Sequence, residues 1–135
     1  VGSEMCIRDR VQVINIDHET ELLGGAGNVV NNLKKLGAQV DIISVIGNCE
    51  ISNKLISLLH KIKVETKYLI AQKDRISSKK SRIIASQQQV VRFDRESSNN
   101  IDEISQNKII DTFNEIVKIY DVVLLSDYGL SLIHI

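Results

Sequence analysis

A glycine-rich turn that runs directly into an amphipathic helix is the feature that most constrains how this chain folds. The turn contains three glycines, Gly24, Gly25 and Gly27. The apolar residues after it recur at helical spacing, which predicts that one helix face packs: Val29, Val30, Leu33 and Leu36. Gly37 follows them, at the place where a residue in the left-handed conformation is expected to end the helix.

The start of this helix is a candidate binding site. Backbone N–H groups are expected to be free there, and glycines leave them open to an oxygen-rich ligand. Asn28 adds an amide that can donate to and accept from a hydroxyl. The dinucleotide pattern G-x-G-x-x-G fails, because Val30 stands at its last position, and no Gly-Lys-Ser/Thr follows as in a P-loop. From the pattern alone, a ligand site and a structural turn both remain open.

Charge and cysteine content exclude several classes of protein. The 17 basic residues balance the 17 acidic ones, which gives no electrostatic case for binding nucleic acid or an anionic membrane. No apolar run is long enough to cross a bilayer. Cys6 and Cys49 lie far apart, which argues against a disulfide scaffold or zinc site and predicts a reducing cytoplasm. The histidines show no metal-ligand spacing, so no metal site is expected.

Apolar patterning along the rest of the chain predicts an α/β domain. Four strands are expected, the first half-buried and the others buried, at residues 11–16, 39–46, 64–71 and 121–126. Helices should begin near residues 48–50 and at Asp102 and Glu103. The last helix carries an apolar stripe: Ile104, Ile109, Ile110, Phe113, Ile116 and Val117. Such alternation is typical of a mainly parallel sheet flanked by helices.

Two segments depart from this alternation. Residues 79–85 and 88–94 are short runs that predict an antiparallel pair. The two ends of the chain, residues 1–10 and 130–135, resemble translated adaptor sequence, so they are not expected to belong to the native domain. The native part is therefore expected to be residues 11–129, an internal and incomplete piece of a longer domain.

Four stretches together resemble the ribokinase (PfkB) family of carbohydrate kinases. They are the glycine turn with its helix and the residues 45–48, 80–94 and 125–129. The third stretch contains a Gln-Gln-x-x-Arg-x-Asp run, and it is similar to the family members that phosphorylate D-glycero-D-manno-heptose 7-phosphate. The resemblance implies a ribokinase-like fold in which residues 79–95 form a small antiparallel lid over the sugar site. Asn48 and Cys49 depart from the family, which usually has acidic residues there.

The resemblance also implies which residues bind the substrate. Asn28 and the backbone of Gly24 and Gly25 would meet sugar hydroxyls. Guanidinium and ammonium groups suit phosphate, and three cations are candidates: Lys80, Arg82 and Arg92. Gln88 and Gln89 match the family run, and Asp127 should end the last parallel strand, where ligands bind in α/β sheets. The alternatives are solvated strand charges, cross-strand pairs and, for Asp127, a helix cap.

The implied activity is transfer of a phosphoryl group from ATP, with Mg²⁺, to a sugar hydroxyl. The base aspartate of the family has no match here, so this chain alone is expected to be inactive. The resemblance places the enzyme in ADP-heptose synthesis for lipopolysaccharide, in the cytoplasm, as a homodimer joined through the lid. Another ribokinase-like carbohydrate kinase, or a non-catalytic sugar-binding relative, remains open.

Overall fold

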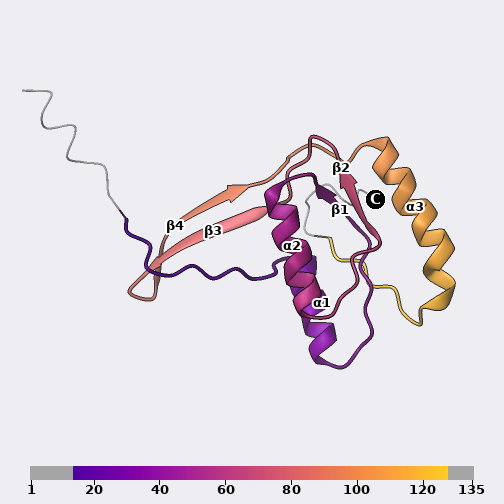
Figure 1. The fold of residues 1–135 in the computed structure, drawn as a ribbon, viewed down its shortest axis with the longest axis horizontal. Helices are drawn as coiled ribbons and strands as arrows, with labels where there is room; N and C mark the ends of the chain where they lie inside the picture. Colours follow the sequence, from indigo (N-terminus) through magenta and orange to yellow (C-terminus); the bar gives the residue numbers. More distant parts are fainter. Residues whose placement is uncertain (1–13, 128–135) are drawn as a thin grey trace, which may run out of the picture.

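The computed structural model describes residues 14–127 as two small sheets and three α-helices (Figure 1). The elements, in chain order, are α1 (Ala26–Lys35), β1 (Ser44–Gly47), α2 (Glu50–Lys61), β2 (Leu69–Gln72), β3 (Lys79–Ala85), β4 (Gln88–Arg95), α3 (Glu103–Ile116) and the 3₁₀ turn Val117–Ile119. Strands β1 and β2 are parallel, whereas β3 and β4 are antiparallel. An α/β arrangement with a parallel and an antiparallel pair is therefore confirmed.

Helix α1 ends as its glycine predicts. Gly37 has a φ of 91°, and Ala38 N–H donates to the carbonyl of Leu33 at 3.1 Å. This is the Schellman arrangement, in which a left-handed residue lets the chain turn back onto the last helical carbonyls. Val30 is buried as expected, but Leu36 is 83% exposed, so its predicted packing is wrong. Leu36 lies at the C-cap, where the chain leaves the helix.

The core lies where the parallel pair meets α1 and α2. β1 and β2 pair from Ser44 opposite Leu69 to Gly47 opposite Gln72. The consecutive residues Val45 and Ile46 are both buried, as a strand covered on both faces requires. Side chains from both helices and the following loop form one apolar cluster: Val30, Leu59 and Val64. Both strands are shorter than predicted, because apolar patterning marks burial while strand ends depend on the hydrogen-bonding partner.

Two of the expected strands do not form in the described part of the chain. Residues 14–16 have no regular structure, and residues 11–13 of the same prediction lie outside the described range. Residues 121–126 form no helix or strand, and Val122 is 80% exposed. A strand needs a neighbour to take its N–H and C=O groups, and no segment within residues 14–127 pairs with either one.

Helix α3 begins where the sequence predicts and lies beside β2 (Figure 1). The side chain of Asp102 caps it by accepting from Ser105 N–H at 2.7 Å. Its apolar stripe is only partly covered. Ile109, Phe113, Ile116 and Val117 are half-buried, but Ile104 and Ile110 are exposed, which corrects the expected packing of those two residues.

Strands β3 and β4 form a hairpin that projects away from the parallel pair (Figure 1). Its turn contains Ser86 and Gln87, both with positive φ, which matches the right-handed twist of the strands. A register shift between Ile83 and Ile84 leaves Val90 without an opposite residue. The antiparallel pair expected at residues 79–85 and 88–94 is confirmed, and its role as a lid stays a prediction.

Candidate functional site

In the glycine turn at the start of α1, Gly24 and Gly25 are exposed but Gly27 is buried, and fewer donors are open than expected. Gly25 is the N-cap with a φ of 51°, a conformation that favours glycine. The N–H groups of Gly27 and Asn28 donate to the carbonyls of Gly24 and Gly25, at 3.0 and 3.1 Å. The expectation of free N–H groups is therefore wrong for these two residues. Gly24, Gly25 and Asn28 remain accessible to solvent, so the Asn28 amide is the main polar group offered there.

The candidate cations of the hairpin lie on one of its faces. Lys80 is opposite Asp94, and Arg82 is opposite Arg92. Opposite residues point to the same side, as do alternate residues along a strand, so all four side chains share that face. We call this set, Lys80, Arg82, Arg92 and Asp94, the charged face. Within residues 14–127, no hydrogen bond or ion pair joins the charged face to the glycine turn.

Asp94 organises the charged face. Its two oxygens accept from the Nε of Arg92 at 2.9 Å and from the Nη2 at 2.5 Å, and Lys80 Nζ lies 3.5 Å away. Glu96 also lies 3.8 Å from Lys80 Nζ. The hydrogen bond from Arg92 lowers the pKa of Asp94 to about 2, and the carboxylate in turn raises the pKa of Arg92. Asp94 is therefore ionised at neutral pH.

The two glutamines of the candidate site are divided by the hairpin register. Gln89 is opposite Ile84, which lies on the same side of β3 as Arg82, so Gln89 extends the charged face toward the turn. Gln88 is opposite Ala85 and lies on the other side. Both residues are exposed. The structure thus brings one glutamine, and not the pair, to the side of the cations.

Asp127 does not lie at the end of a strand, where the sequence predicted it. It is exposed and follows a segment that forms no strand, so it does not stand at the carboxyl end of a parallel strand. Tyr128 and Gly129 of the same motif lie outside the described residues. The roles weighed for Asp127, which are binding of sugar, water or magnesium on one side and a helix cap on the other, all stay predictions.

The base of the hairpin is tied to the end of β1 through residues that sequence reasoning did not single out. Gly47 N–H donates to the Oγ of Ser77 at 3.0 Å, and the Oγ of Ser52 lies 2.8 Å from that of Ser77. A Cβ on Gly47 would lie 2.1 Å from the carbonyl oxygen of Arg75. The partners are about 25 to 30 residues apart, so no local pattern could have marked them.

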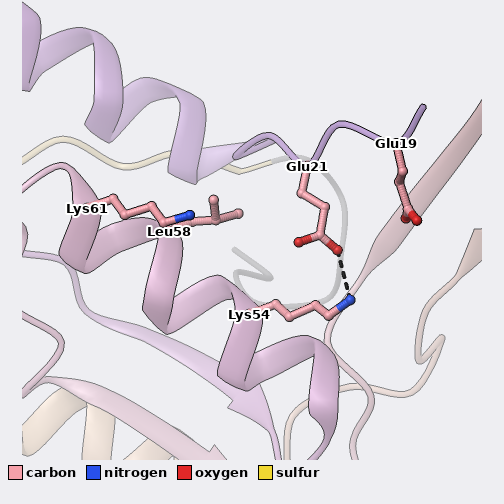
Figure 2. Close-up of a pocket in the computed structure, with 5 residues that line it drawn as sticks. All are labelled: Glu19, Glu21, Lys54, Leu58 and Lys61. Atoms are coloured by element: carbon pink, nitrogen blue, oxygen red, sulfur yellow. Dashed lines mark hydrogen bonds and ion pairs between the residues drawn. The ribbon is translucent and has the colours of Figure 1, made fainter.

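A cavity of about 410 Å³ lies between the segment before α1 and helix α2 (Figure 2). It is lined by Glu19, Glu21, Lys54, Leu58 and Lys61. Lys54 Nζ bonds Glu21 Oε1 at 2.9 Å, which lowers the pKa of Glu21 and raises that of Lys54. The ion pair between Lys54 and Glu21 therefore crosses this cavity. None of the candidate site residues lines it.

Residues 14–127 contain no group of three or more His, Cys, Asp or Glu side chains placed to hold a metal ion. Over the same range, no helix combines the length and apolar character needed to span a membrane.

Comparison with known proteins identifies relatives over most of the chain. The model of the pfkB family carbohydrate kinases matches residues 5–127. Bifunctional protein HldE of Aliarcobacter butzleri is 55% identical over 119 residues, which are 88% of this chain and 25% of that protein. The proteins of the same name from Campylobacter fetus and Sulfurimonas denitrificans are 48% and 45% identical, over 88% of this chain and 26% and 25% of their own lengths.

The chain thus spans about a quarter of the length of the curated relatives it matches. The family match begins at residue 5, inside the stretch 1–10 that the sequence suggested is non-native. The boundary at residue 11 stays a prediction.

Proposed function

The chain belongs to the pfkB family of carbohydrate kinases, and we propose that it forms the sugar-binding part of an ATP-dependent D-glycero-D-manno-heptose 7-phosphate kinase. The observation that carries this proposal is the charged face. Three cations gathered on one side of a hairpin suit a substrate that already bears a phosphate. The proteins named HldE, at up to 55% identity, support the same choice. The pathway would be ADP-heptose synthesis for lipopolysaccharide, in the cytoplasm.

In this proposal the glycine turn and the charged face bind different parts of the substrate. The Asn28 amide and the exposed backbone at Gly24 and Gly25 bind sugar hydroxyls, since an amide offers both a donor and an acceptor. The charged face and Gln89 bind the phosphate end and a neighbouring hydroxyl. The hairpin, acting as a lid, brings its cations to the sugar held at the glycine turn. The general base and the nucleotide site belong to the longer protein.

The opposite side of the hairpin supports a homodimer joined through the lid. That side carries Phe93 and Val91, opposite Ser81 and Ile83. Phe93 is 57% exposed and Val91 is 44% exposed. Exposed apolar side chains on an unpaired hairpin suit contact with another protein surface.

Steady-state kinetics of the full-length protein test the proposal. With ATP and magnesium present, we expect turnover of heptose 7-phosphate and much weaker turnover of the same heptose without phosphate. Preference for an unphosphorylated sugar would assign the chain to another carbohydrate kinase. Sugar binding without any turnover would assign it to a non-catalytic relative.

A further inference from the structure

The positive charge on the hairpin is unevenly compensated. Lys80 lies near two carboxylates, Asp94 and Glu96, and Arg92 is paired with Asp94. Arg82 makes no ion pair or hydrogen bond with any residue in the range 14–127. It stands directly opposite Arg92, and like charges facing each other across two strands are destabilising. The charged face therefore has one uncompensated cation beside a second cation that is held in place.

The contact with Asp94 fixes how Arg92 is presented. A guanidinium carries five N–H donors in a rigid plane. Asp94 occupies the edge formed by Nε and Nη2. The donors of Nη1 and the second donor of Nη2 form another edge, which can bind an anion in parallel fashion. Because the bidentate contact fixes the plane, this second edge is set before a ligand arrives.

We propose that Asp94 is a positioning residue that holds Arg92 so that Arg92 and Arg82 together bind the phosphate group of a phosphorylated sugar. This inference rests on the proposed function and selects among the three candidate cations. A phosphate monoester carries roughly two negative charges near neutral pH and would end the repulsion between the two guanidinium groups. Lys80 lies near two carboxylates, which offset its charge, so it contributes less to phosphate binding than the two arginines do.

The test compares two sugars in the full-length kinase. We would measure kcat and KM for heptose 7-phosphate and for unphosphorylated heptose in the wild type, Arg82→Ala, Asp94→Asn and Asp94→Glu. Glu115→Gln, an exposed carboxylate on α3, is the matched control. We expect Arg82→Ala to raise KM for the phosphorylated sugar about tenfold, since charged hydrogen bonds are lost.

Asp94→Asn should raise the same KM about 2- to 10-fold, because Arg92 must then be ordered on binding. In both variants the KM for unphosphorylated heptose should change much less than the KM for heptose 7-phosphate. Asp94→Glu should recover most of the loss, and Glu115→Gln should change nothing. A purely structural role for Asp94 would instead affect both sugars equally.

Three results would overturn the inference while leaving the proposed function intact. They are equal losses for both sugars, no change in Arg82→Ala, or tighter binding of the phosphorylated sugar in Asp94→Asn, which would mean that Asp94 only screens the cations. If the wild type turns over neither heptose, the proposed function fails. The inference is then decided by titrating inorganic phosphate with ³¹P NMR detection. Weaker binding in Arg82→Ala and Asp94→Asn upholds it, and unchanged binding rejects it.

Discussion

At the scale of single residues, the ionisation of Asp94 sets the arrangement of the charged face. Its pKa falls from 3.8 to about 2, mainly through the hydrogen bond from Arg92. A carboxylate with a lowered pKa favours the folded state above its unfolded pKa, and this contribution is lost as the pH falls through the folded value. The stabilisation that Asp94 gains from Arg92 and Lys80 should thus be complete above about pH 4 and be lost from there toward about pH 2.

Carbon-detected NMR of aspartate-labelled protein checks this prediction. The Asp94 carboxyl shift should stay nearly constant between neutral pH and roughly pH 3.5, below the range where an ordinary aspartate begins to titrate. In Arg92→Ala the pKa of the same carboxyl should rise toward the ordinary value of 3.8, because the principal partner is gone and only Lys80 still lowers it. A wild-type midpoint at or above 3.8 would show that the pair does not form in solution.

At the scale of elements, the hairpin was predictable because its signals are local. Alternating side chains and a short polar turn mark both strands within one stretch of sequence. Which cation meets which carboxylate was not predictable, because the register shift between Ile83 and Ile84 and the contact of Lys80 with Glu96 appear only in three dimensions. Residues 121–126 show the opposite case. Their apolar pattern indicates burial, but a strand also needs a second strand to pair with, and apolar patterning does not show whether one is present.

The end of β1 gives a prediction about the join between the parallel pair and the hairpin. Gly47→Ala should destabilise the complete kinase domain by about 3 kcal/mol or more, because the added Cβ meets the Arg75 carbonyl at 2.1 Å. Gly37→Ala should cost about 1 kcal/mol from its left-handed φ alone, since nothing lies within 4 Å.

Gly24→Ala is the matched control, with open space around its Cβ and no left-handed φ. Urea unfolding of the three variants gives the comparison. Equal effects of Gly47→Ala and Gly24→Ala would mean that the segment through Arg75 does not pass close to β1.

At the scale of the whole molecule, much apolar surface is uncovered within the described residues. Val122, Leu124 and Leu125 are exposed in one segment, and Ile104 and Ile110 are exposed on α3. Exposed apolar groups of this kind favour association with other surfaces. We therefore expect the 135-residue chain, expressed alone, to be marginally stable and prone to aggregate. A cooperative thermal transition from a soluble monomer would contradict this expectation.

The same chain should also lack kinase activity. It offers candidate sugar-side residues, and it spans only about a quarter of the length of the curated relatives it matches. An assay coupled to ADP formation, with heptose 7-phosphate as substrate, should remain at background for the isolated chain. The full-length protein, assayed in parallel, is the positive control. Turnover by the isolated chain would mean that the general base and the nucleotide site do not lie in the rest of the longer protein.

The proposed binding of sugar hydroxyls at the glycine turn is tested by Asn28→Ala in the full-length kinase. Loss of one hydrogen-bonding amide typically costs about 0.5–1.5 kcal/mol, which corresponds to about 2- to 12-fold in catalytic efficiency. We predict a loss of this size for the sugar phosphate and an unchanged KM for ATP. Unchanged sugar kinetics with a raised KM for ATP would show that the turn holds nucleotide, and would contradict the account.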